Sequence, residues 1–322
     1  IRDSHLASHA TDEEVSMFYH VPYLNGAETV TGATGMVGSV LCKRLQTLDI
    51  PHLKLSRHPS HSSEDQVFWD PHERILETEK LREVETVIHL AGEPVGKRWT
   101  HEIKKKIIFS RSDAGRFLFE TLAAQDKPPK TLISASGIGF YGVANETKFD
   151  EESAKGRGFL ADVVEDWESA PEPLHKEGTR VVNMRMGVIL SPDGGALAKM
   201  LPVFKFGLGG TLGTGHQMMS WIAMEDMIRA IMFFIENETL QGIYNLVSPN
   251  AVSNVEFTTI LGWVLKRPTL FPVPALALRV IFGEMAMQTI LASQHVIPLS
   301  LIHISEPTRL RRISYAVFCL KK

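Results

Sequence analysis

Three glycines spaced three apart, Gly32, Gly35 and Gly38, form the pattern in this chain that points most directly to chemistry. They follow a β-prone run, residues 29–31, and open a helical stripe of apolar residues. The first glycine permits a tight turn, the second lets backbone N–H groups approach a pyrophosphate, and the third lets the helix pack closely on the sheet. Because the helix N-terminus adds free N–H groups and partial positive charge, the segment predicts a dinucleotide site.

A cation at the end of the next strand indicates which dinucleotide binds. The run 52–55 is strand-like and ends in Ser56 and Arg57. An acidic residue there would bind the hydroxyls of an adenosine ribose, whereas an arginine suits the 2′-phosphate of NADP. We therefore predict NADP as the cofactor. The alternative interpretation is that Arg57 is a solvated cation at a strand end.

Small and polar residues end two further strand-like runs, at the edge where open α/β sheets bind their ligands. Leu90, Ala91 and Gly92 close the first run, and their arrangement leaves room for a nucleotide. Ser136 ends the next run and is a candidate for hydrogen bonding to a substrate carbonyl or hydroxyl; its alternative role is to cap a turn. Tyr141 follows, and it either lines the pocket or packs its ring in the core.

Strand-like and helix-like segments alternate along the chain, which predicts an α/β fold with a Rossmann-type, doubly wound parallel sheet. The strand-like runs are 29–31, 52–55, 66–69, 86–90, 131–134 and 179–184, and the helix-like segments are 100–124, 161–170, 224–236, 254–265 and 275–282.

Four regions follow from this alternation. We predict an NADP-binding core over residues 27–190 and a smaller substrate-cap region, with returning core elements, over 191–298. Residues 1–26 lack clear periodicity, so we expect an atypical N-terminal extension there. Residues 301–322 resemble the translation of a sequencing adapter, and we expect the tail over 299–322 to be foreign to the protein.

The composition weighs against several other classes of protein. A net charge of −3 gives no reason to expect nucleic acid or an anionic membrane as a partner, and no apolar run is long enough to span a bilayer. Two cysteines cannot build a disulfide framework, no Cys/His cluster has the spacing of a metal site, and no signal peptide is visible. We therefore expect a cytoplasmic protein with a small-molecule substrate and no metal, and leave its oligomeric state open.

Several segments together resemble one branch of a known superfamily. TGATGMVG at 31–38, HLAGEPVGKRWT at 89–100, SGIGFYG at 136–142 and WIAMEDM at 221–227 are similar to the extended short-chain dehydrogenases/reductases. The likeness is to an atypical epimerase-like branch, short-chain dehydrogenase family 39U, whose bacterial members are called nucleoside-diphosphate-sugar epimerase-like or cell-division-inhibitor-like. It extends in one register over about residues 27–298.

The resemblance also implies roles for individual residues. The residues of the pyrophosphate turn would be Gly32, Thr34, Gly35, Met36, Val37 and Gly38. Ser56 and Arg57 would hold the 2′-phosphate. The wall beside the adenosine ribose would be formed by Leu90, Ala91 and Gly92. It further implies that Arg111 contacts the cofactor and that Ile189 lies near the nicotinamide end.

The chain departs from most of the superfamily in its catalytic motif. Typical members use Tyr-x-x-x-Lys, in which the lysine lowers the tyrosine pKa so that the hydroxyl can exchange protons near neutral pH. None of the five tyrosines here is followed by a lysine four residues later, and Val163 and Trp167 occupy the expected places. Ser136 and Tyr141 are the remaining catalytic candidates. The carboxylates of the same helix are expected to be solvated: Asp162, Glu165 and Glu168. Two residues after a glycine-rich loop are further candidates for substrate contact: His216 and Gln217.

Three functions are compatible with these residues. An NADP-dependent oxidoreductase acting on a small carbonyl or hydroxyl compound is favoured by the glycine turn and Arg57. A sugar-nucleotide epimerase would keep NAD bound and need the Tyr/Lys pair, so Arg57 and the missing pair weigh against it. A regulator that binds NADP without catalysis, linked to cell division, is suggested by the same missing pair.

Overall fold

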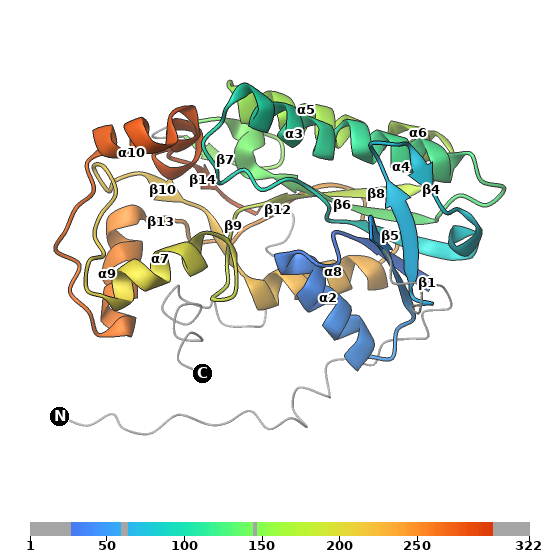
Figure 1. The fold of residues 1–322 in the computed structure, drawn as a ribbon, viewed down its shortest axis with the longest axis horizontal. Coiled ribbons are helices and arrows are strands. Elements are labelled where there is room, and N and C mark those ends of the chain that lie inside the picture. Colours follow the sequence, from blue (N-terminus) through green and yellow to red (C-terminus); the bar gives the residue numbers. More distant parts are fainter. Residues whose placement is uncertain (1–26, 59–63, 144–146, 299–322) are drawn as a thin grey trace.

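The computed structural model describes residues 27–58, 64–143 and 147–298 of the chain (Figure 1). The predicted N-terminal extension and C-terminal tail lie outside the described residues. An eight-stranded sheet forms the centre, in the order β12-β8-β6-β5-β1-β2-β3-β4, and its strands are parallel except for the β3–β4 pair. The strands are β1 Ala27–Thr31, β2 His52–Ser56, β3 Gln66–Asp70, β4 Ile75–Leu76, β5 Val84–His89, β6 Thr131–Gly137, β8 Arg180–Met186 and β12 Gly242–Leu246.

The strand order confirms the doubly wound prediction. From β1 the chain runs outward through β2 and β3, and it then returns to build the other half through β5, β6, β8 and β12. Such a reversal leaves a crevice at the carboxyl ends of the strands on either side of β1. The glycine-rich turn follows β1 directly, so the fold places it at this crevice.

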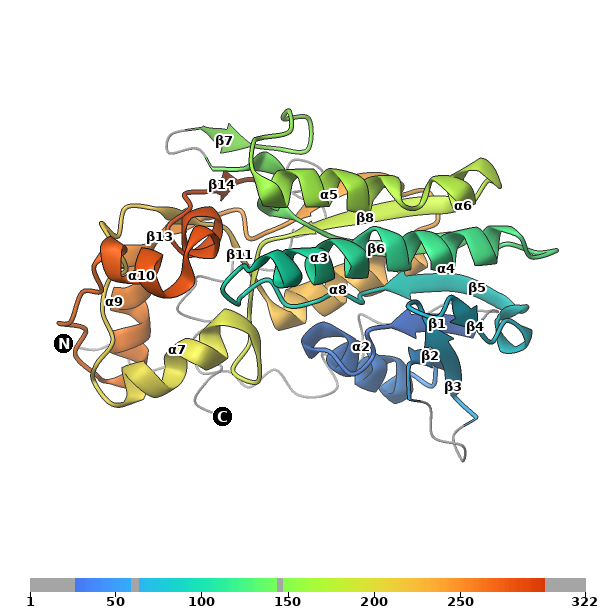
Figure 2. The same cartoon turned by 45° about the horizontal axis from the view of Figure 1, so that its top comes forward.

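Helices bury both faces of the sheet, as Figures 1 and 2 show. On one face α2 (Met36–Thr47) and α8 (Met224–Glu236) pack their apolar stripes against the strands. The helices of the other face are α3 His101–Arg111, α4 Asp113–Ala123, α5 Phe159–Ser169 and α6 Glu172–Lys176.

The helix predicted over 100–124 is in fact two helices, α3 and α4, which meet at Ser112. Backbone hydrogen bonds continue across Ser112, from its N–H to Ile108 and from Arg116 to its carbonyl, so the two helices follow each other directly. Just before the junction, the Ser110 hydroxyl accepts the N–H of Glu93 at 2.9 Å. The prediction of one continuous helix is wrong at this single residue, which apolar periodicity does not mark.

A smaller region begins at the carboxyl end of β8 and is drawn in yellow to red in Figure 1. Its elements are β9 Val188–Leu190, α7 Gly195–Lys205, β10 Met218–Met219, β11 Trp221–Ala223, β13 Val252–Ser253, α9 Asn254–Leu265, α10 Ala275–Phe282, the π-helical turn η3 Ala286–Ile290 and β14 His295–Val296, which pairs with β7 Lys148–Phe149. Trp221, Phe257 and Leu197 lie in a separate core of this region. No helix among the described residues is long and apolar enough to cross a membrane.

One position of the central strand β1 is acidic. Glu28 is 2 % exposed and lies opposite Thr86 of β5. Burial raises the pKa of its carboxyl from 4.5 to about 8, the negative charge of Glu85 adds to the effect, and a hydrogen bond with Thr86 opposes it. The carboxyl of Glu28 is therefore mostly protonated in the folded protein near pH 7.

Candidate functional site

The glycine-rich turn between β1 and α2 is packed against backbone on two sides. Gly32 has a φ of +67°, and a Cβ there would stand 2.8 Å from the carbonyl group of Leu90. A Cβ at Gly38 would collide with the carbonyl oxygen of Gly32. The close contact of the third glycine is therefore with the turn itself, rather than with the sheet face that the pattern predicted.

The N-terminus of α2 is open to an anion. Gly35 is the N-cap residue, no side chain caps the first N–H groups, and the first turn contains no acidic residue. Thr34 and Gly35 are exposed, whereas Val37 packs against the core beneath them. Because these N–H groups carry the positive end of the helix dipole, they suit a pyrophosphate.

A buried Thr–His pair, which the sequence analysis missed, holds the end of β5 against the turn. Thr31 Oγ1 accepts the N–H of Leu90 at 3.1 Å and the N–H of Ala91 at 3.2 Å. The same oxygen lies 2.9 Å from Nδ1 of His89, so the hydroxyl and the imidazole share one hydrogen bond. Burial lowers the pKa of His89 to about 4, so the ring stays neutral. Thr31 thereby fixes Leu90 and Ala91 beside Gly32.

The predicted clamp on the 2′-phosphate lies on the strand next to the turn. β1 and β2 pair in parallel with Thr31 opposite Leu55, so Ser56 stands level with Gly32. The Ser56 hydroxyl accepts the N–H of His58 at 3.1 Å, and the side chain of Arg57 is exposed. The fold thus brings both residues to the correct edge of the sheet, while their role toward a phosphate stays a prediction.

The smaller region after β8 contacts the glycine-rich turn at Met36 of α2. A Cβ at Gly194 would lie 2.9 Å from the sulfur of Met36, so this side chain packs on the backbone just before α7. The next residue, Gly195, is also close to the carbonyl oxygen of Ile189, at 3.6 Å from a Cβ built there. Ile189 and the first turn of α2 are therefore neighbours, as a shared ligand would require.

The two catalytic candidates, Ser136 and Tyr141, belong to one buried hydrogen-bond network. Ser136 Oγ donates to Oε1 of Glu168 at 2.6 Å. The guanidinium of Arg185 donates two bonds of 2.7 Å to the same carboxylate and one of 3.0 Å to the Tyr141 hydroxyl. That hydroxyl donates to Oδ1 of Asn245 at 2.7 Å. These five residues are called the Arg185 network below.

This network shows that one prediction is wrong. The side chain of Glu168 is only 9 % exposed and is paired with Arg185, so it is not a solvated carboxylate. Asp162 and Glu165 on the same helix are exposed, as predicted, and both pair with Lys155. Helical spacing cannot distinguish Glu168 from its neighbours, because its partner comes from the distant strand β8.

The same network limits what the two candidate hydroxyls can do. The single proton of Ser136 is donated to Glu168, so the hydroxyl keeps only its acceptor capacity for a substrate. Burial raises the pKa of Tyr141 above its ordinary value, although hydrogen bonds with Arg185 and Asn245 act in the opposite direction. A tyrosine whose pKa is raised is poorly matched to proton transfer near neutral pH.

Arg111 lies against the end of β5, next to Gly92. A Cβ at Gly92 would be 3.4 Å from Cζ and from Nη2 of the guanidinium. Its Nη1 donates to the carbonyl oxygen of Glu93 at 2.9 Å, and its Cζ lies 4.9 Å from the centre of the Trp167 ring. Burial lowers the pKa of Arg111 to about 10, so it remains a cation at neutral pH.

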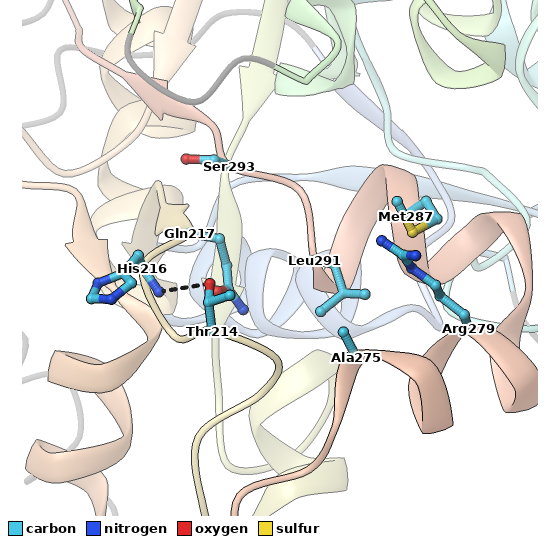
Figure 3. A pocket seen from close by; sticks show the side chains of 8 residues that line it. All are labelled: Thr214, His216, Gln217, Ala275, Arg279, Met287, Leu291 and Ser293. Atoms are coloured by element: carbon cyan, nitrogen blue, oxygen red, sulfur yellow. Dashed lines mark hydrogen bonds between the residues drawn. The ribbon is translucent and has the colours of Figure 1, made fainter.

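A pocket of about 520 Å³ lies in the smaller region after β8 (Figure 3). Its walls are formed by Thr214, His216, Gln217, Ala275, Arg279, Met287, Leu291 and Ser293. The His216 ring points away from the other labelled side chains, and the backbone N–H of His216 donates to the Thr214 hydroxyl. Gln217 donates to the carbonyl of Leu212 at 2.9 Å, so the proposed substrate contacts of both residues stay predictions. Within the described part of the chain, no group of His, Cys, Asp or Glu side chains could hold a metal ion.

Comparison with known sequences gives a consistent result. Residues 29–246 match the NAD dependent epimerase/dehydratase family, and residues 273–302 match a domain of unknown function, DUF1731. An epimerase family protein of Mycobacterium bovis is 38% identical over 278 residues, which cover 86% of this chain and 91% of the relative. The chloroplastic SDR39U1 homolog of Arabidopsis thaliana is 37% identical, over 84% of this chain and 79% of the relative.

Comparison with solved structures agrees. Human epimerase family protein SDR39U1, solved with NADPH, has a TM-score of 0.82 and 28% identity, covering 91% of this chain and 98% of that one. A nucleoside-diphosphate sugar epimerase of Corynebacterium glutamicum has a TM-score of 0.73 and 33% identity, covering 91% of this chain and 57% of that one.

A doubly wound sheet whose first strand leads through a glycine-rich turn into an uncapped helix defines a Rossmann-type protein. The chain belongs to the NAD dependent epimerase/dehydratase family, in the atypical SDR39U1-like branch that its motifs had implied.

Proposed function

We propose that this protein is an NADP-dependent oxidoreductase that acts on a small carbonyl or hydroxyl compound. The observation that carries the proposal is the cradle at residues 32–38, where bare backbone lies beneath the uncapped N-terminus of α2. A pyrophosphate suits such a cradle because the first N–H groups of α2 have no side-chain cap and carry the positive end of the helix dipole. The human relative solved with NADPH supports this choice of cofactor.

The remaining assignments follow from the order of the strands. The first N–H groups of α2 hold the pyrophosphate, and Ser56 with Arg57 binds the 2′-phosphate one strand away. Leu90 and Ala91, fixed by hydrogen bonds to Thr31, form the wall beside the adenosine ribose. The nicotinamide, when bound, exchanges a hydride with the substrate carbon.

The proton of the reaction needs a different source from the usual tyrosine. Tyr141 is 1 % exposed and its hydroxyl is shared between Arg185 and Asn245. Ser136 retains lone pairs with which it orients a substrate hydroxyl, but its own proton is engaged. We therefore assign Ser136 to positioning and take solvent water as the proton source.

A second candidate function is a regulator that binds NADP without turnover. The observation that favours it is the engagement of both candidate hydroxyls in the Arg185 network. Sugar-nucleotide epimerisation is supported less, because it needs a tyrosine that exchanges protons with the sugar. The UDP-glucuronic acid 4-epimerase of Bacillus cereus, solved with NAD, is similar in fold at 16% identity.

Titrations of the full chain with NADPH, NADP, NADH and NAD test the proposal. We expect thermal stabilisation by the two phosphorylated cofactors, because a ligand that binds only the folded state stabilises it. In Arg57→Ala, loss of a charge-assisted bond should weaken NADPH binding about 10- to 100-fold and leave NADH binding unchanged, as measured by calorimetry. Arg116→Ala, at an exposed position of α4, is the control and should bind NADPH like the wild type.

Three results would contradict parts of this proposal. Equal losses for NADPH and NADH in Arg57→Ala would remove its role toward the 2′-phosphate. No stabilisation by any of the four cofactors would exclude the dinucleotide site. Tight NADPH binding without oxidation across a panel of aldehydes and ketones would favour the regulator over the oxidoreductase.

A further inference from the structure

The pocket in the smaller region after β8 combines apolar walls with one fixed charge. Its volume of about 520 Å³ lies within the range of roughly 300–1,000 Å³ that is common for small-ligand sites. The apolar residues that line it are Ala275, Met287 and Leu291. Arg279 brings a guanidinium to the same pocket, and no acidic residue is among its lining residues. The pocket therefore offers a positive charge next to an apolar surface.

The charge of Arg279 is not neutralised within the part of the chain that the structure describes. Its side chain forms no ion pair and no hydrogen bond with a described residue. The acidic residue nearest to it in the sequence is Glu284, and both oxygens of that carboxylate are engaged. One bonds to Nζ of Lys104 at 2.6 Å, and the other accepts the amide of Gln288 at 2.9 Å. The guanidinium is thus available to an anion from solution.

The wall that contains Arg279 is fixed to the core of the protein. Arg98, in the loop after β5, donates to the carbonyls of Val280 and Ile281 at the end of α10, the second at 3.0 Å. The next segment is the π-helical turn η3, in which the N–H of Leu291 donates to the carbonyl of Ala286 at 2.8 Å. Such turns are frequent at functional sites, and here the turn brings Met287 to the pocket.

The opposite wall is held to the same segment by backbone hydrogen bonds. The N–H of Gly213 donates to the carbonyl of Val273 at 2.9 Å, and the N–H of Val273 donates to the carbonyl of Thr211 at 2.8 Å. The Gln217 amide closes this loop by donating to the carbonyl of Leu212 at 2.9 Å. Both walls are therefore positioned by the fold, so a ligand does not have to order them.

We infer that this pocket binds a small monocarboxylate with an apolar body, of the kind represented by a short straight-chain fatty acid. The guanidinium of Arg279 donates to the carboxylate, and the body lies along Met287 and Leu291. Figure 3 shows Arg279 and Met287 on one side of the pocket, Gln217 on the other, and Leu291 between them. A single cation matches a single negative charge and would leave a dianion half compensated.

This inference goes beyond the proposed function and does not depend on it. None of the residues that line the pocket is among those assigned to the dinucleotide. The titrations described next contain no dinucleotide, so failure of the cofactor proposal leaves their result unchanged.

A series of carboxylates tests the inference at the pocket itself. The full chain, labelled with ¹³C at its methionine methyl groups, is titrated with acetate, butanoate and hexanoate at constant ionic strength. The Met287 signal is assigned by its loss in Met287→Leu. We expect a saturable shift of this signal, with an affinity that rises about two- to fourfold for each added methylene, because each one buries apolar surface. Hexan-1-ol, which lacks the charge, should bind about tenfold more weakly than hexanoate.

The variants of Arg279 separate the charge from the apolar walls. Arg279→Gln should weaken hexanoate binding about tenfold and leave hexan-1-ol binding unchanged, because the alcohol does not use the charge. Arg279→Lys should retain more hexanoate affinity than the glutamine variant, since it keeps the positive charge. The control is Arg267→Gln, an exposed arginine of the same region that does not line the pocket, and it should bind hexanoate like the wild type. Arg279 is exposed, so these substitutions should preserve the fold.

Three outcomes would overturn the inference. The first is a Met287 signal that does not shift with any of the carboxylates. The second is an equal hexanoate affinity in the wild type and in Arg279→Gln, which would remove the guanidinium from the site. The third is an affinity that stays constant from acetate to hexanoate, which would show that the apolar walls contribute nothing.

Discussion

Glu28 and His89 lie on neighbouring central strands, and burial shifts their pKa values in opposite directions. The carboxyl pKa rises to about 8 and the imidazole pKa falls to about 4, because in both residues burial disfavours the charged form. Both side chains are therefore mostly neutral near pH 7. Arg111 stays charged near pH 7, because burial lowers its pKa only to about 10.

The raised pKa of Glu28 should make the free energy of unfolding depend on pH. Its folded pKa is above the unfolded value of 4.5, so the folded state binds the extra proton and stability falls as the pH rises from about 4.5 to about 8. At about 1.4 kcal/mol per pKa unit, the full loss is on the order of 5 kcal/mol. Glu28→Gln should remove this slope, measured as the free energy of unfolding in urea at pH 5 and pH 8.

The control for this experiment is Glu83→Gln, an exposed carboxylate just before β5. It should retain the wild-type slope between the two pH values. A slope that persists unchanged in Glu28→Gln would show that Glu28 is not the titrating group.

At the scale of elements, the unit formed by β1, the turn and α2 depends on backbone that approaches backbone. Gly32 is pressed against Leu90 of the β5 end, and Gly38 is pressed against Gly32. Because backbone meets backbone at these positions, there is no room for a Cβ, and the glycines are required. The shape of the turn and its capacity to bind a ligand therefore depend on the same short segment.

Gly38→Ala tests this dependence. The added methyl group meets the Gly32 carbonyl and the Cα of Ala33, neither of which can rotate away, so we expect a loss of about 1–3 kcal/mol in unfolding free energy. The displaced turn should also reduce the thermal stabilisation by NADPH. Gly96→Ala is the control, because its Cβ would meet only the end of the Lys199 side chain at 3.4 Å. Normal stability and NADPH response in Gly38→Ala would refute the close packing.

At the scale of the whole molecule, the Arg185 network joins segments that are far apart in the chain. Ser136 and Arg185 come from β6 and β8, Glu168 from α5, and Asn245 from β12. Asn245 also donates to the carbonyl of Ile297 at 3.0 Å, which ties the end of the described chain to the sheet. The position of α5 over the strand ends is therefore set by a buried ion pair.

Glu168→Gln should destabilise the protein by about 3–5 kcal/mol, because it leaves the guanidinium of Arg185, 2 % exposed, without its counter-charge. Adding Arg185→Met to this variant should recover most of the loss, since the unpaired charge is then gone. Chemical unfolding of the single and double variants measures the coupling. Glu165→Gln, exposed on the same helix, should change stability by less than about 0.5 kcal/mol, and a similar value for Glu168→Gln would rule out the stabilising pair.

The sequence by itself was enough to predict the doubly wound sheet, most of its strands, and the turn at Gly32, Gly35 and Gly38. These features depend on apolar periodicity and on backbone freedom, which are encoded by residues close together in the chain. The sequence also predicted that Arg57 follows the end of a strand, and parallel strands bring that end to the same edge as the turn; its role toward a phosphate stays a prediction.

Only the tertiary structure decided which polar residues are buried and paired. In the sequence Glu168 resembles its helix neighbours, but in the fold it pairs with Arg185 of β8. The hydrogen bond between Ser110 and the loop at Glu93 likewise appears only in the fold. Desolvation and ion pairing depend on contacts between segments distant in the chain, and local spacing carries no information about those contacts.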